Sequence, residues 1–518
     1  MYINFKTIGG IEYGTVMKSV RAGCKVGKSD QLYLGRVIDK RKNIFKSRER
    51  GIFVYNIEGN TFEPVPAEYI EPKIDRKTKY PARPKLIISF GDMYILDKYV
   101  RKCGFIDAID GTNFRNKDTL HALFSYYILS MHANCHAEDW WGLTYAKILY
   151  PKAQMSSQRI SDALADIGSE DAKRGFFKEY FRFLERREIG GKSNGIDSID
   201  NGILIDSSGL PNAVHLPLTA VNTHNGTVSE EIRLIYVVQQ RTGLPLFFRY
   251  VAGNVIDVST LTRTIAELKA NGINTKFAIL DAGYYTGKNA DVLLDAKVSF
   301  ISRLKSNLCV YKQVVKEHLA TLEAKENLVR YNKRLVYIKC IPCMIGSKED
   351  RPAYAYLCKD LTMKHELERH LVERAEDESI SCGEIYDKMQ AHGVFMLISS
   401  RRISKENILP LYYTRDQVEK VFELCKQGAK ILPVNVETEA TFRGHLMMTF
   451  MASVMLKIMS VQLKGSVLTT ESMLMIMHEQ HAAVYENELI TTEPVRKMNE
   501  IYKAFGITCP VSLPLNQG

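Results

Sequence analysis

The stretch KFAILDAGYYTGKNADVLLDAKVSFISRLKSN, residues 276–307, indicates the fold class of the chain. An apolar run of strand length ends at Asp281, and a second run of this kind begins at Val298. The residues between them, GKNADVLLDAK, have the pattern of a short helix. A strand, a helix and another strand in this order indicate an α/β protein that carries a carboxylate at a strand end.

The residues before this stretch extend the same sheet. GILIDSSG, residues 202–209, is a buried-type strand that we expect to end at Asp206. EIRLIYVVQQ and LFFRYVAG, joined by the turn RTGLP, read as two more strands, and STLTRTIAELKANG predicts a helix from Ser259 to Gly272. Three meandering strands followed by alternating helices and strands predict a mixed α/β sheet.

Two aspartates therefore follow apolar strands, Asp206 and Asp281. In α/β sheets, ligands bind beyond the strand ends, where the loops open. A lone aspartate at such a place is commonly a turn or helix-capping residue. Two on neighbouring strands, joined by a glutamate on a later helix, suit hard divalent cations, which prefer oxygen ligands.

The glutamate comes from LYYTRDQVEKVFELCKQ, residues 411–427. On one continuous helix, Tyr412, Arg415, Glu419 and Lys426 fall within a stripe of roughly 60°. An amphipathic helix with a solvated edge explains each charge separately. Together with the aspartates, the stripe instead suits two-metal chemistry on phosphodiesters, with a metal-binding carboxylate flanked by groups that bind DNA phosphates.

The composition of the 518-residue chain agrees with a nucleic-acid partner. Apolar residues make up 45% and charged residues 25%, as in soluble globular proteins, and the net charge is +11. Such an excess favours polyanions, nucleic acid first. The start MYINFKTIGG lacks the apolar region of a signal peptide, and the longest apolar run, residues 446–456, is too short to span a bilayer. We expect no membrane segment and a cytoplasmic protein with reduced thiols.

Three motifs together resemble a known family. They are ILIDSSGLPN, FAILDAGYYT and the spacing Tyr412-x2-Arg415-x3-Glu419-x6-Lys426. They are similar to the DDE transposases of bacterial insertion sequences and, more narrowly, to the "IS-four" group, which a YREK signature at this spacing marks. The resemblance covers residues 196–475 well and the first 190 residues loosely. It implies an RNase H-like catalytic core with a β-rich insertion before the glutamate.

The resemblance also implies roles for individual residues. Asp206, Asp281 and Glu419 match the catalytic and metal-binding triad, which would hold two Mg²⁺ ions, with Mn²⁺ able to substitute. The expected DNA-binding residues are Tyr412, Arg415, Lys426, Arg303 and Lys305. Some members flip a base with a Trp-containing motif, and because this chain has DAGYY there, we expect Tyr284 or Tyr285 to stack instead. Arg443 and His445 in FRGH are either further contacts or part of a helix cap.

The family organisation predicts six segments. They are a β-rich N-terminal segment (1–85), a helical domain that binds DNA ends (86–195), the first part of the core (196–305), the β-rich insertion (306–392), the second part of the core (393–475) and a C-terminal tail with a role in dimerisation (476–518). In the helical domain, a short helix with Gln158 and Arg159 near its start is either a groove-reading helix or an ordinary bundle helix. The basic cluster from Arg36 to Arg50 either contacts phosphates or is a solvated hairpin.

The activity implied is cut-and-paste transposition. Activated water nicks a strand, the freed 3′-hydroxyl attacks, and the released ends join target DNA. The implied partners are the terminal inverted repeats of the chain's own element and target DNA, bound by a homodimer at the bacterial nucleoid. Two other functions remain open, a catalytically silent DNA-binding regulator and an RNase H-fold nuclease without strand transfer.

Overall fold

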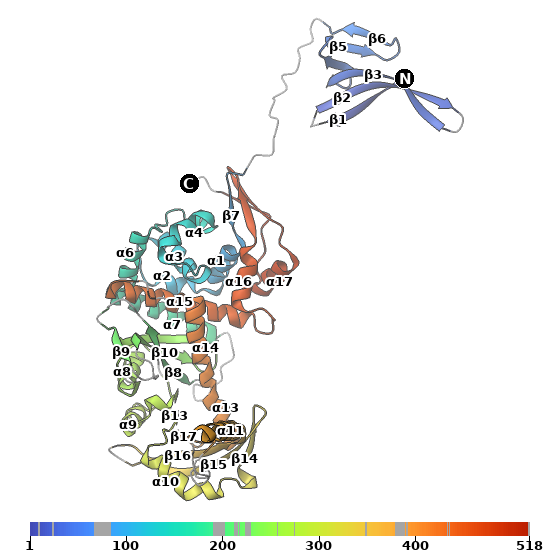
Figure 1. Cartoon of the computed structure of the whole chain (residues 1–518). Coiled ribbons are helices and arrows are strands. Elements are labelled where there is room, and N and C mark those ends of the chain that lie inside the picture. Colours follow the sequence, from blue (N-terminus) through green and yellow to red (C-terminus); the bar gives the residue numbers. More distant parts are fainter. Residues whose placement is uncertain are drawn as a thin grey trace. The chain divides into compact units, whose positions relative to one another are not determined.

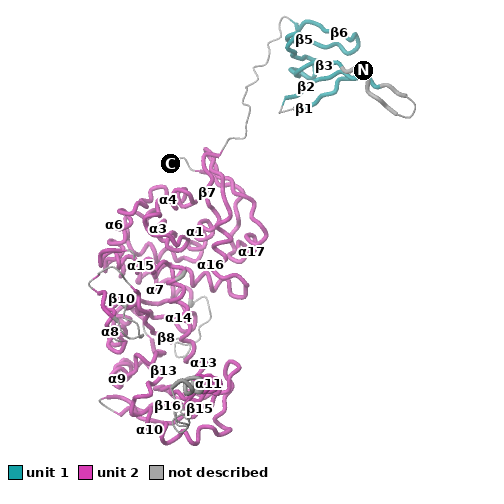
Figure 2. Tube along the Cα trace, in the orientation of Figure 1, with its two compact units in different colours: residues 1–83 teal, residues 84–518 magenta. Residues whose placement is uncertain are grey.

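The computed structural model describes the chain except for residues 9–10, 23–24, 67–83, 190–201, 212–215, 217, 223–228, 256, 274, 348–349, 379–388, 390–391, 433, 435 and 516–518. The chain divides into two compact units, Met1–Arg83 and Pro84–Gly518 (Figure 2). The boundary predicted between residues 195 and 196 lies outside the described residues, and the segments on its two sides belong to the same unit.

The first unit is one antiparallel sheet whose strands follow each other in chain order. The strands are β1 (Tyr2–Ile8), β2 (Ile11–Ala22), β3 (Lys25–Asp39), β4 (Ile44–Ser47), β5 (Gly51–Asn56) and β6 (Thr61–Pro64). Residues alternate between buried and more exposed along β5, as expected for a sheet with one covered face. The covered face holds a small apolar core of Val16, Leu34, Phe45, Phe53 and Tyr55.

The second unit begins with one strand and a run of helices (Figure 1). They are β7 (Leu86–Ser89), α1 (Gly91–Cys103), α2 (Ile106–Asp110), α3 (Lys117–Leu129), α4 (Ala137–Leu143), α5 (Ala146–Leu149), α6 (Ser157–Ile167) and α7 (Glu170–Ile189). The predicted helix with Gln158 and Arg159 is α6. Both side chains bond to Asp162 on its exposed side, at 3.1 and 3.4 Å.

A mixed sheet follows, which confirms the predicted α/β class. Its first elements are β8 (Ile203–Pro211), β9 (Ala220–Asn222), β10 (Ser229–Gln239), β11 (Pro245–Ala252), α8 (Asp257–Ala270), β12 (Phe277–Leu280), α9 (Gly287–Asp295), β13 (Ser299–Arg303) and β17 (Val394–Ser399). The strand order in this half is β11-β10-β8-β12-β13-β17. β8, β12 and β13 run parallel, whereas β10, β11 and β17 each pair antiparallel with their neighbours.

The segment predicted as a β-rich insertion, residues 306–392, is partly helical, and its described strands belong to the core sheet. Its described elements are α10 (Cys309–His318), β14 (Leu328–Tyr331), β15 (Arg334–Ile345), β16 (Arg351–Asp360) and α11 (Leu361–Glu378). β16 pairs with β17 along six residues. The strands β16, β15 and β14, in this order, therefore continue the core sheet beyond β17. Backbone pairing on both sides of β17 joins the segment to the core.

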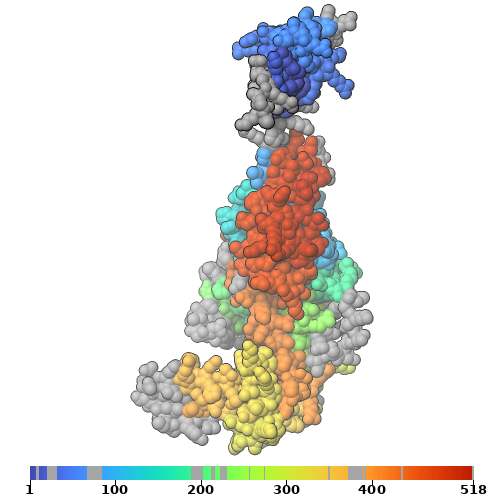
Figure 3. Space-filling model, turned by 90° about the vertical axis from the view of Figure 1, so that its right-hand side faces the viewer, coloured from blue at the N-terminus to red at the C-terminus, as the bar shows by residue number. Residues whose placement is uncertain are grey.

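The last residues do not form the predicted tail. After α16 (Thr470–His478) come β18 (His481–Val484), β19 (Glu488–Thr491), α17 (Arg496–Phe505) and β20 (Ser512–Pro514). β18 pairs with β7, so the two ends of this unit share one four-stranded sheet in the order β20-β19-β18-β7. Buried side chains such as Leu489, Ile501 and Phe505 hold these elements in the main core. The C-terminal part of the chain, coloured red, forms a broad surface in Figure 3.

The apolar helix predicted near residues 446–456 is α15 (Glu439–Gln462). Among the described residues it alone is long and apolar enough to cross a membrane, but 83% of its apolar window is buried inside the protein. It contacts α3, α6, α14 and β11, and thus joins the N-terminal helices to the sheet (Figure 1). Where α15 crosses α6, a Cβ at Gly444 would overlap the carbonyl group of Leu164.

This crossing gives a stability prediction. Gly444→Ala should lower the free energy of unfolding by about 1–3 kcal/mol, because the added methyl group must push α6 away from the core helix. Differential scanning calorimetry would measure the effect. Gly142→Ala on α4 is the matched control, since nothing lies within 4 Å of its added Cβ. Equal melting temperatures for the two variants would contradict the close packing at Gly444.

Candidate active site

Parallel pairing of β8 and β12 brings the two aspartates together. Leu280 lies opposite Ile205 in this pairing, so the residues that follow, Asp281 and Asp206, lie side by side on neighbouring strands. β12 is buried along its whole length and ends at Leu280. The prediction that Asp206 ends its own strand is wrong. β8 continues to Pro211, because β10 still pairs with it after β12 has ended.

The glutamate is carried by a helical segment that differs from the single helix predicted. The segment consists of α13 (Lys405–Tyr412), a 3₁₀ turn (Tyr413–Arg415) and α14 (Asp416–Gly428). The Thr414 hydroxyl donates to the Leu411 carbonyl at 2.7 Å, which competes for the acceptor that an α-helix would use at this point. The tighter turn changes the pitch, so the angles calculated for one continuous helix do not apply.

Arg415 lies among the three carboxylates. Its Nη1 is 3.3 Å from Oδ2 of Asp206 and 3.2 Å from Oδ1 of Asp281. Its Nη2 is 3.0 Å from Oε1 of Glu419, one helical turn further along the chain. The three predicted acids therefore converge on one guanidinium group, although they come from β8, the end of β12 and α14.

Burial and neighbouring charges shift the pKa values of Asp206 and Arg415. Burial raises the pKa of Asp206 to about 6, although the Arg415 charge and the Ser207 N–H group both act to lower it. Asp281 and Asp257 raise this pKa further by repulsion. Burial disfavours the charge of Arg415, but Asp281 and Asp206 outweigh it and raise the pKa of the guanidinium. The negative charge of Asp206 is therefore costly in this arrangement.

A second polar cluster supports the first and was not predicted from the sequence. The Ser207 hydroxyl donates to Oδ1 of Asp257 at 2.6 Å and accepts from Nε of Arg233 at 3.1 Å. Arg233 also pairs with Asp257 at 3.5 Å. Asp257 is the first residue of α8. From the sequence alone, an acid at the start of a helix indicates only a capping residue. The cluster holds β8 directly beside Asp206.

The DAGYY turn is packed rather than open. Tyr284 is fully buried, and its ring therefore offers no face to a base. Burial raises its pKa well above the usual value. Tyr285 is half-buried near Phe300, with ring centroids 6.3 Å apart. The Asn289 amide donates to the carbonyl groups of Tyr284 and Val258, at 2.8 and 2.9 Å, and so ties this turn to α8.

The predicted DNA-binding residues lie at different depths. Tyr412 is only 4% exposed, and burial raises its pKa to about 12. Lys426 lies near the surface, where its Nζ donates to the Ser208 hydroxyl at 2.9 Å. The Arg303 guanidinium lies over the Phe395 ring at 5.3 Å, at the end of β13, and Lys305 is exposed just beyond that end.

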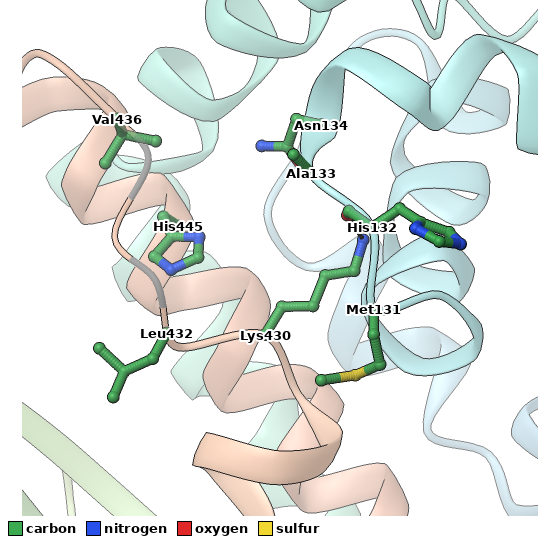
Figure 4. A pocket seen from close by; sticks show the side chains of 8 residues that line it. All are labelled: Met131, His132, Ala133, Asn134, Lys430, Leu432, Val436 and His445. Carbon is green, nitrogen blue, oxygen red and sulfur yellow. Dashed lines mark hydrogen bonds between the residues drawn. The ribbon is translucent and has the colours of Figure 1, made fainter.

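His445 lies apart from these residues, in a separate cavity of about 130 Å³ (Figure 4). It is buried in α15 and its Nδ1 is 2.8 Å from the Tyr127 hydroxyl. Burial lowers the pKa of His445 to about 4, so the imidazole is neutral at pH 7. It packs the helix rather than capping it, since Thr438 is the N-cap of α15. Lys430 faces the same cavity and donates to the His132 carbonyl at 2.7 Å.

The triad is not preformed around one ion position. Within the described part of the chain, no three His, Cys, Asp or Glu side chains are grouped as metal ligands. The Arg415 guanidinium contacts all three acids instead. The donor atoms are nonetheless carboxylate oxygens, the ligands that Mg²⁺ and Mn²⁺ prefer.

The raised pKa of Asp206 predicts how its removal affects stability. Between about pH 4, the ordinary pKa of an aspartate, and about pH 6, Asp206 keeps its proton in the folded state but loses it in the unfolded state. Ionisation of Asp206 above pH 6 therefore lowers the free energy of unfolding by on the order of 2–3 kcal/mol. Asp206→Asn should therefore raise the melting temperature, and the gain should grow as the pH rises from 4 to 7. Asp171→Asn, at an exposed position of α7, is the control. A gain that stays constant with pH would contradict a costly carboxylate.

Comparisons with known proteins gave a family and a similar solved structure. A family model described as the transposase DDE domain matches residues 197–455, half of the chain. The chain is also similar to a solved structure of a piggyBac transposase synaptic complex with hairpin DNA, with 13% identity and a TM-score of 0.38 over 75% of this chain and 78% of that one. A comparison with curated proteins gave no match. The matched region contains Asp206, Asp281 and Glu419, and the chain belongs to the family of DDE-domain transposases.

Proposed function

We propose that this chain is an active DNA transposase of the "IS-four" type, which cleaves the ends of its own element and joins them to target DNA. The observation that supports this most is the convergence of Asp206, Asp281 and Glu419 on Arg415. A silent regulator would have no need to keep three repelling acids together at a cost in stability.

The sheet supports an RNase H-like core. Counting β8 as the first strand and leaving out the short β9, the order β11-β10-β8-β12-β13 reads 3-2-1-4-5. Strand two is antiparallel to strand one, and strands one, four and five are parallel. In this count the first acid lies on strand one and the second directly after strand four, the order that the family resemblance implies.

Asp206, Asp281 and Glu419 would hold the Mg²⁺ ions. When bound, such ions activate the attacking oxygen and stabilise the leaving oxygen at a phosphodiester. Other side chains would orient the carboxylates and bind the DNA backbone. The Ser207–Asp257–Arg233 cluster orients β8 at Asp206, and Lys426 lies where it can neutralise a backbone phosphate. The Arg415 guanidinium is also of the kind that would bind a phosphate bidentately.

The partners and surroundings are part of the same proposal. The DNA partners are the terminal inverted repeats and the target duplex, and a homodimer would hold the paired ends. The helical segment with α6 would bind the ends, and the bacterial cytoplasm at the nucleoid is the expected location. The basic surface charge of the chain favours this partner.

Cleavage of a plasmid tests the proposed chemistry. Supercoiled DNA carrying both flanks of the coding region would be incubated with the protein and Mg²⁺. Glu419→Gln should reduce cleavage by roughly 10²–10⁴-fold, because a catalytic metal supplies several kcal/mol of transition-state stabilisation. Glu423→Gln, one turn further along α14, is the matched control and should cut like the wild type.

The products separate the three functions. Cleavage at the flanks followed by joined DNA supports the transposase. Nicks without joining would show a nuclease of the same fold. Binding to the flanks without any cleavage by the wild type would favour the regulator.

The position of Arg415 predicts competition with the metal. Arg415→Gln should tighten Mg²⁺ binding about ten-fold, since the ion no longer has to displace a guanidinium from three carboxylates, a difference of about 1.4 kcal/mol. Isothermal titration calorimetry without DNA measures this directly. Arg496→Gln, which removes an exposed arginine paired with Glu500, controls for net charge. Weaker binding by Arg415→Gln would instead mean that Arg415 organises the acids for the ion.

A further inference from the structure

The N-terminal sheet carries a row of cations and a tyrosine that the proposed chemistry does not use. Lys6 on β1 lies opposite Tyr13 on β2, and Tyr13 lies opposite Arg36 on β3. Arg36 in turn lies opposite Lys46 on β4. Residues directly opposite each other in antiparallel strands project from the same face of a sheet. The row therefore runs across four neighbouring strands on one face.

This face is the outer one. Phe45, the residue before Lys46, is fully buried in the small core of the unit. Successive side chains of a strand point to opposite faces, so Lys46 and its partners in the row point away from that core. Lys6 and Lys46 are both exposed. With strands about 4.8 Å apart, the row from Lys6 to Lys46 spans roughly 14 Å.

A second tyrosine extends the row along β3. The Tyr33 ring is 59% exposed and stacks against Tyr13, with ring centroids 6.3 Å apart and planes inclined by 27°. A large aromatic side chain this exposed adds little to the core. We call the set of Lys6, Tyr13, Tyr33, Arg36 and Lys46 the tyrosine–cation face.

The charge of this face fits a polyanion. Residues 1–66 contain twelve lysines and arginines against six acids. Arg36 and Lys46 lie directly opposite each other, so two cationic side chains are neighbours on this face. Two neighbouring cations of this kind suit the phosphates of a nucleic-acid strand.

We propose that the tyrosine–cation face binds single-stranded DNA. Sheet faces that combine exposed aromatic rings with cations bind single strands, because unpaired bases stack on the rings while the cations follow the phosphates. Paired bases in a duplex are stacked on each other and offer no free ring face to Tyr33. The site lies in a different unit from the carboxylate triad and does not depend on it, so it holds whether or not the triad cuts DNA.

Fluorescence anisotropy of the full-length protein tests this. The probe is a labelled 20-nucleotide oligothymidine, in EDTA to prevent cleavage and with excess unlabelled duplex to occupy duplex-binding surfaces. Tyr33→Ala should weaken binding about ten-fold, because one stacked base contributes roughly 1–3 kcal/mol. Tyr33→Phe keeps the ring and should bind like the wild type. Arg36→Gln and Lys46→Gln should each reduce the affinity for the oligonucleotide. Each should also reduce the slope of log affinity against log salt concentration by the amount that about one phosphate contact contributes.

Lys42→Gln is the matched control, since Lys42 is an exposed lysine of the same unit in the turn between β3 and β4. It should leave binding unchanged. Circular dichroism of each variant should show wild-type folding, as Tyr33 lies outside the core. Normal binding by Tyr33→Ala, or a loss of equal size in Lys42→Gln, would overturn the proposal. So would binding that the duplex competitor abolishes, because the face would then be a general phosphate-binding surface.

Discussion

The parallel pairing of β8 with β12 is the constraint on which the site depends. It brings Asp206 and Asp281 to the same level on neighbouring strands, because the two strands run in the same direction and their carboxyl ends lie at the same side of the sheet. α14 packs on β8 and β10, which brings Glu419 to that edge as well. A change of register by one residue would turn one aspartate to the other face of the sheet, and the three acids would separate.

The convergence has an electrostatic cost that the surrounding residues offset. Asp206 is buried beside two other acids, and its pKa rises to about 6. Arg415 compensates by ion pairs with all three members of the triad. Of the three acids, Asp206 is the least exposed, whereas Asp281 and Glu419 keep 40% and 56% of their side-chain surface exposed.

The rest of the second unit holds this edge in place. α15 is buried along most of its length and contacts both the N-terminal helices and the sheet, so the two cannot separate without exposing a large apolar surface. The C-terminal residues close the unit by pairing β18 with β7, which are almost 400 residues apart in the chain. The segment after β13 lengthens the sheet through β16 and β17 instead of forming a separate body.

Much of the fold and the core of the site were evident in the sequence. Apolar runs of strand length and the helix between them predicted the α/β class and, together with the YREK spacing, selected Asp206, Asp281 and Glu419, which the structure brings together on Arg415. These signals are local. The sequence did not indicate that Arg415 forms ion pairs with all three acids, that Asp257 bonds to the residue next to Asp206, or that Tyr284 is buried. It also misplaced the end of β8 and described a paired C-terminal sheet as a tail. Each of these depends on contacts between residues distant in the chain, and only the tertiary structure decides such contacts, since local patterns carry no information on which strands pair or which side chains meet.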